Sequence, residues 1–167
     1  MPRRSSDSAK ATRDEMRERM HALGLSLPLI AAEMGRRFSL RPRIAWRHAL
    51  GWPQWKVAQR YRTLHNERIS DNRISEHETW PHGGAKPSLD YLVKLAATYG
   101  HGCTPGHLID LADLEGLEPA ERRVFASVLH PSLAGMHAEV SRALARRVDP
   151  GQVGARPLWL PELEDGH

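Results

Sequence analysis

The stretch RISDNRISEHETWPHGG, residues 68–84, surrounds Ile74 with Arg, Asp, Asn, Ser, Glu and His side chains and ends at Trp80-Pro81 and a glycine pair. Two interpretations explain so many hydrogen-bonding groups in so short a segment. The side chains could bind a metal ion or perform catalysis, or they could form the outward face of a short helix that contacts a polar partner. The spacing of the histidines and the sequence on either side distinguish these interpretations.

The histidines of this stretch do not have the spacing of a zinc site. In the zinc-protease pattern H-E-x-x-H both histidines project from one helix face. His77 and His82 are one residue further apart, so their side chains would diverge by roughly 140° around a helix, and Pro81 would break that helix. Cys103 is the only cysteine, so a deaminase-type cysteine pair and an intramolecular disulfide are both excluded. We therefore expect no metal, no cofactor and no catalytic residues, and hence no enzyme.

The composition is that of a soluble protein. The 167 residues are 40% hydrophobic and 26% charged, and no apolar run is long enough to cross a membrane. The first residues, MPRRSSDSAKATRDEM, lack the apolar segment that follows the arginines of a secretory signal. These features predict a cytoplasmic protein without membrane contact.

Charge is distributed unevenly along a chain whose formal net charge is +4. Lys and Arg outnumber Asp and Glu between Arg41 and Lys86, whereas acidic residues are in excess from Pro87 to Gly116. A basic block followed by an acidic one suggests that one face is presented to a polyanion. A mixed, solvated surface explains the same distribution, so the motifs must decide between the two.

Nearly every segment has the period of a helix, and none has the strict alternation of a half-buried strand. Thr12 and Glu15 have the spacing of a capping box, and glycines such as Gly51 and Gly100 are typical helix ends. The sequence therefore predicts an all-α fold. The expected helices cover residues 12–23, 26–38, 41–50, 54–64, 70–79, 88–99, 104–114, 119–129 and 133–148. Residues 150–167 are rich in Pro and Gly and are expected to form a flexible tail.

Three motifs occur in the order found in a known family. They are RHALGWPQWKVA at 47–58, NRISEHETWPHGGAKPSLDYLVKLAATYG at 72–100 and TPGHLID at 104–110. Together they resemble the Xre-type (Cro and lambda-repressor-like) helix-turn-helix regulators, in particular those of the actinobacterial type. The resemblance implies a lambda-repressor-like DNA-binding domain at 41–116, with an N-terminal helical extension at 1–40, C-terminal helices at 117–149 and the tail. The chain departs from the family between the second and third helices of this domain, where RTLHNERIS makes the turn longer.

The resemblance assigns roles to individual side chains of a protein that reads double-stranded DNA through the helix around 70–79. Asn can pair with adenine, Glu can accept from cytosine, and Arg can donate to guanine or phosphate. The expected base-reading residues are Gln54, Asp71, Asn72, Arg73, Ser75 and Glu76. The expected phosphate contacts are Lys56, Arg60 and Lys86. In the family the acid matching Glu78 pairs with the arginine matching Arg47, so these two are expected to form a structural ion pair.

Two further questions stay open from the sequence. A sequence-specific transcriptional regulator of this kind is expected to be a homodimer, with the contact in the apolar stripes of 117–148. LWLPEL, residues 158–163, could be a docking peptide for a protein partner. The alternative function is a helical adaptor that binds protein through the helix-turn-helix surface, which the acidic residues Asp71, Glu76 and Glu78 favour.

Overall fold

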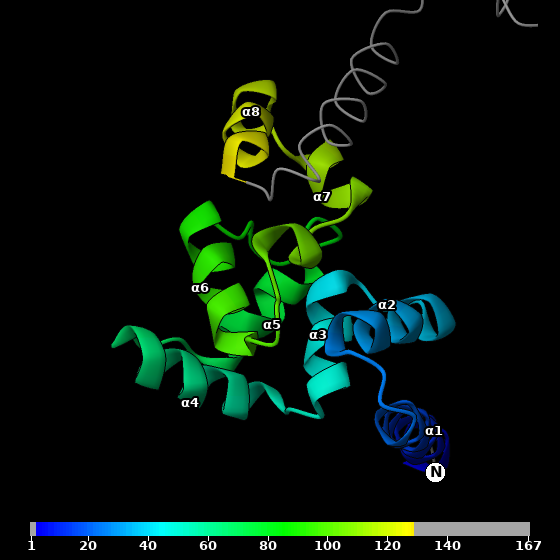
Figure 1. Ribbon diagram of the computed structural model, residues 1–167. Helices are drawn as coiled ribbons and strands as arrows, with labels where there is room; N and C mark the ends of the chain where they lie inside the picture. The colour runs from blue at the N-terminus through cyan, green and yellow to red at the C-terminus, as the bar shows by residue number, and fades with distance from the viewer. Residues whose placement is uncertain (1–2, 129–167) are drawn as a thin grey trace, which may run out of the picture.

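The computed structural model describes residues 3–128, and within this part every regular element is a helix (Figure 1). The expected all-α fold is confirmed to that extent. None of the helices in residues 3–128 combines the length and apolarity needed to cross a membrane. The elements are α1 (Arg3–Ala22), α2 (Leu27–Phe38), α3 (Pro42–Leu50), α4 (Gln54–His65), α5 (Asp71–Thr79), α6 (Leu89–Tyr99), the 3-10 helix η1 (Pro105–Leu108), α7 (Leu111–Gly116) and α8 (Pro119–Val128).

One cluster of buried apolar residues connects these helices, from Met20 in α1 to Phe125 in α8. Ile30 and Met34 of α2 lie in the same core as Trp46 of α3, and all three are buried. The part of the chain expected to be an N-terminal extension therefore contributes side chains to the core of the predicted helix-turn-helix region. Figure 1 shows α2 and α3 on one side of this core and α4, α5 and α6 on the other.

Local signals set the ends of the central helices. The Ser70 and Ser88 hydroxyls each accept a hydrogen bond from a backbone amide three residues later and cap α5 and α6. Gly51 ends α3 with a φ of +68°, a left-handed conformation that costs glycine little. The expected helices in this region agree with α3 to α6 within one or two residues.

The first helix begins earlier than predicted. It extends from Arg3, so Thr12 lies inside it and cannot form the expected capping box with Glu15. The Thr12 hydroxyl instead donates to the Ser8 carbonyl, at an Oγ1–O distance of 2.9 Å. A hydroxyl satisfied by the preceding turn is tolerated in a helix interior, which explains why the cap-like pattern was misleading.

The helix expected at 104–114 is interrupted. The chain forms η1, becomes extended at Ile109 and starts again as α7. Asp110 caps α7 because its carboxylate accepts from the Asp113 amide at 3.1 Å, while the Asp113 carboxylate accepts from the Asp110 amide at 2.9 Å. α8 falls within the helix expected at 119–129. Leu129, the helix expected at 133–148 and the tail at 150–167 lie outside the described residues.

Candidate nucleic-acid interface

The inner face of α5 is fixed by burial. Ile74, His77 and Glu78 are buried, whereas the predicted base-reading residues of this helix all lie on its exposed side. The His77 ring packs against Tyr91 in a tilted arrangement, with 4.3 Å between ring centroids, and its Nδ1 lies 2.9 Å from the Ala85 carbonyl oxygen. Burial lowers the pKa of His77, so this side chain is neutral at neutral pH and adds no charge to the exposed face.

Glu78 joins α5 to the two preceding helices. The Arg47 guanidinium donates to both carboxylate oxygens of Glu78, with an Nε–Oε1 distance of 2.6 Å and an Nη2–Oε2 distance of 3.1 Å. The structure thus contains the ion pair that the family resemblance implied, and only 5% of the Glu78 side chain is exposed. Gln54 also donates to Glu78, at 2.9 Å. The Gln54 amide is therefore engaged inside the protein and does not point freely toward a ligand.

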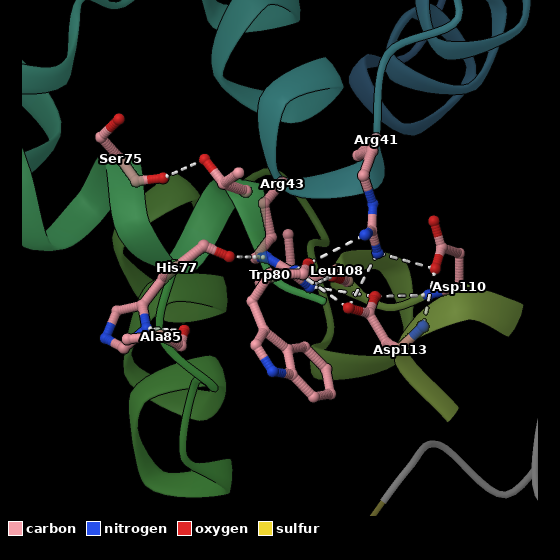
Figure 2. A network of polar contacts seen from close by, with 10 residues as sticks. Arg41, Arg43, Ser75, His77, Trp80, Ala85, Leu108, Asp110 and Asp113 are labelled. Carbon is pink, nitrogen blue, oxygen red and sulfur yellow. Dashed lines mark hydrogen bonds and ion pairs between the residues drawn. The ribbon is translucent and has the colours of Figure 1, made fainter. Parts of the chain in front are cut away.

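A second network holds the C-terminal end of α5 (Figure 2). Arg43 is fully buried and donates to both carboxylate oxygens of Asp113, at 2.9 and 3.0 Å. The same guanidinium donates to the carbonyl oxygens of His77 and Trp80, each at 2.9 Å. Arg41 also donates to the Trp80 carbonyl at 2.9 Å and pairs with Asp113 at 2.8 Å. These bonds satisfy carbonyl groups that the end of the helix leaves without helical partners.

Sequence reasoning missed this second network. Arg43 and Asp113 are 70 residues apart, and the sequence marks Arg43 only as one more cation in a basic block. Asp110 and Asp113 have a helix-cap spacing that could have drawn attention to the acidic side. No local pattern connects the two sides, because the contact depends on how α3 and α7 pack.

The glycine pair after α5 allows a close return of the chain. Gly84 has a φ of +67°, and a Cβ at this position would lie 2.0 Å from the Glu76 carbonyl oxygen. That oxygen accepts from the Ala85 amide at 3.2 Å. The abrupt change from polar side chains to Trp80-Pro81 and glycine thus reflects a loop packed tightly against the end of the helix.

The outer face of α5 is polar and nearly balanced in charge. The side chains of Asp71, Asn72, Arg73, Ser75 and Glu76 are all exposed. Arg73 and Glu76 bind each other, with an Nη1–Oε2 distance of 3.0 Å across one helical turn. Asn72 and Ser75 carry hydrogen-bonding groups without charge, so this face could form directional contacts with a polar ligand.

α4 and the segment that follows it carry a group of four cations. α4 contains no Asp or Glu. Lys56 and Arg60 lie over the Trp52 ring, with their charged groups 5.5 and 5.8 Å from its centroid. Arg62 and Arg68 are exposed on the side of α4 that adjoins the start of α5. Within residues 3–128 none of these four cations forms an ion pair.

Two charged side chains, Lys86 and Glu67, form ion pairs away from the cations of α4. Lys86, an expected phosphate contact, pairs with Glu121 of α8. Figure 1 shows α8 and α4 at opposite ends of α6, so the structure does not group Lys86 with the cations of α4. Glu67, just after α4, pairs with Lys94 of α6 and does not neutralise Arg62 or Arg68. Sequence reasoning missed these two arginines, although an acid-free helix in a basic block was a signal that could have found them.

Comparison with known proteins adds no relative to this description. No family model, no curated protein and no solved structure matches the chain. The assignment of a function consequently depends on the residues themselves, namely the exposed polar face of α5 and the unpaired cations of α4 and residue 68.

Proposed function

We propose that the protein is a sequence-specific DNA-binding transcriptional regulator with an Xre-type, lambda-repressor-like helix-turn-helix, in which α5 enters the major groove. One observation carries this proposal. α5 is held on its inner side by buried bonds from α3 and α4 and presents hydrogen-bonding side chains on its outer side, and the adjoining α4 and residue 68 carry four cations that form no ion pair within residues 3–128.

In this proposal the four cations supply affinity for DNA, and the outer face of α5 supplies sequence specificity. Phosphate contacts position a protein on DNA, and base-edge contacts in the groove discriminate sequences. Within residues 3–128, Lys56, Arg60, Arg62 and Arg68 form no ion pair that a phosphate would have to break. If all four bind phosphate, the logarithm of the binding constant falls with the logarithm of salt concentration with a slope of about −3.6, since each contact contributes about −0.9.

Fewer residues are suited to base contacts than the family resemblance implied. Asn72 can bind adenine with both groups of its amide, and Ser75 can contact a base edge. Arg73 and Glu76 can contact bases only by giving up the bond between them. We assign Gln54 a structural role and no base contact, because its amide donates to Glu78. Dimerisation through 117–148 remains part of the proposal, and most of that segment lies outside the described residues.

A helical adaptor is the second candidate, and it is favoured by a different observation. Trp55 and Leu64 of α4 are each 58% exposed. Trp and Arg are the residues enriched among the energetically dominant contacts of protein interfaces. Asp71 would also oppose a DNA backbone, whereas it would be neutral or favourable toward a protein.

Salt dependence distinguishes the two candidates. Binding of the full chain to a labelled duplex of random sequence is measured by fluorescence anisotropy from low to high salt. The proposal expects binding to fall steeply with salt, with a slope of up to about −3.6 when all four cations contact phosphate. Arg37→Gln on α2, an exposed arginine away from α4, serves as the matched control and should leave the slope unchanged. An absence of binding at low salt would contradict the DNA-binding proposal and favour the adaptor.

A further inference from the structure

A groove lies along the outer side of α4. Its lining residues come from α4 and from residues 68–70, which lead into α5, and its volume is about 480 Å³. Trp55, Ala58 and Ile69 supply apolar surface, while Arg62 and Arg68 supply positive charge. An exposed apolar surface bordered by polar side chains is typical of an interaction site.

The side chains that line the groove indicate what kind of segment would bind there. Aromatic and aliphatic side chains would cover the indole of Trp55, and carboxylates would pair with the two arginines, which are free of ion pairs within residues 3–128. The occupant should therefore be a short segment that combines apolar residues with negative charge.

The end of this chain has that composition. LWLPEL, residues 158–163, contains Trp159 and three leucines, and it is followed by Glu164 and Asp165. No Lys or Arg occurs after Arg156. Residues 158–165 lie outside the described part of the chain, and only their sequence enters the argument.

We propose that residues 158–165 dock in the groove beside α4 of the same molecule. Trp159 and the adjacent leucines cover Trp55 and Ile69, while Glu162 and Glu164 pair with Arg62 and Arg68. The opposite charges set the position of the segment, and burial of the apolar side chains provides the main favourable free energy.

The connecting chain contains enough residues to allow this contact. Residues 129–157 separate the end of α8 from the docking segment. As one continuous helix they would span roughly 40 Å, which exceeds the diameter of about 30 Å of a small domain. Tethering also gives the segment an effective concentration on the order of 1 mM, which favours the same molecule over a second copy in dilute solution.

Docking at this position has a consequence for DNA, which rests on the proposed function. The segment would occupy Arg62 and Arg68, two of the cations proposed to contact phosphate. It would therefore compete with DNA and lower the affinity of the full chain.

Docking is tested without DNA, by hydrogen exchange of the full chain. Amides of residues 158–165 should exchange at least about tenfold more slowly than in an unstructured peptide of the same sequence. The double variant Arg62→Glu/Arg68→Glu should lose this protection, and the tail variant Glu162→Arg/Glu164→Arg should lose it as well. Combining all four substitutions should restore it. The matched control, Arg37→Glu on α2, should keep full protection.

Each other outcome overturns the assignment. Protection that survives both reversals would place the segment elsewhere, and absence of protection in the parent chain would mean that it does not dock. Protection that rises with protein concentration would identify a second copy as the occupant. Since Arg62 and Arg68 are exposed, thermal melting should show that all variants remain folded.

A separate measurement tests the competition with DNA. Trp159→Ala/Leu160→Ala removes apolar contacts without adding charge and should raise affinity for a random-sequence duplex several-fold. The same pair should have no effect in the Arg62→Glu/Arg68→Glu background. If the parent chain and the tail variant both fail to bind DNA at low salt while the exchange protection is observed, the proposed function fails and the docking stands. Unchanged affinity in the tail variant would overturn the competition alone.

Discussion

Arginines of two neighbouring helices have opposite surroundings. Arg43 and Arg47, on α3, are shielded from solvent and each is bound to a carboxylate. Arg60 and Arg62, on the next helix, are exposed and form no ion pair within residues 3–128. Only Gly51, Trp52 and Pro53 separate the two helices.

The difference separates a structural role from a binding role. A buried guanidinium without a partner would cost several kcal/mol, so Arg43 and Arg47 are compatible with the fold only together with their acids. An exposed guanidinium keeps its hydration and costs the fold little, so it can exchange water for an anion. The comparison predicts large effects on stability for the first group and effects confined to binding for the second.

The largest effect is expected at Arg43. Arg43→Met would leave the His77 carbonyl without its buried donor, and would leave Asp113 and the Trp80 carbonyl with Arg41 as their only guanidinium partner within residues 3–128. We expect a loss of about 3–5 kcal/mol in the free energy of unfolding, measured by urea denaturation. Arg36→Met, at an exposed arginine paired with Glu33, is the control and should leave the urea midpoint unchanged. Equal behaviour of the two variants would remove the distinction between the groups.

A somewhat smaller effect is expected for Arg47 and Glu78. Each single substitution to Ala should cost about 3 kcal/mol, at the lower end for a buried pair because 13% of the Arg47 side chain is exposed. Replacing both with apolar residues should cost less than the sum of the single changes. A double-mutant cycle measures this coupling, and strictly additive values would show that the ion pair contributes nothing.

Asn72 tests the binding role of α5. Asn72→Ala should weaken binding to a site selected from random DNA by about 1–3 kcal/mol and have little effect on a random duplex. Glu76→Ala should behave likewise at another base position. Both residues are exposed, so the free energy of unfolding should not change. Equal losses on the two duplexes would show that these side chains do not read bases.

The smallest effect is expected from single cations of the second group. Arg62→Gln should weaken binding to all duplexes similarly and reduce the magnitude of the salt slope by about 0.9. Lys56→Gln and Arg60→Gln should do the same, whereas Lys86→Gln should have less effect because Lys86 pairs with Glu121. Anisotropy titrations at several salt concentrations check these values. A larger change at Lys86 than at Arg62 would reverse the assignment of the phosphate contacts.

The local features of this protein could be predicted from sequence because their causes lie within a few residues. Helical period predicted α5 and α6, and the structure shows that Ser70 and Ser88 cap their first turns. Asn72, expected on the outward face of this helix, is exposed, and Ile74, the single aliphatic residue among the polar ones, is buried. The same local reasoning failed at Thr12, where a hydroxyl bond inside a helix resembles a cap in sequence.

The tertiary structure decided which charges are structural. The sequence by itself determined an all-helical chain with a basic block, but within that block it did not distinguish Arg43 from Arg62. Arg43 is buried because α7 brings Asp113 to it from 70 residues away, and Lys86 is paired because α8 brings Glu121. Burial and pairing of a charge depend on contacts between elements distant in sequence, and local propensities contain no information about these contacts.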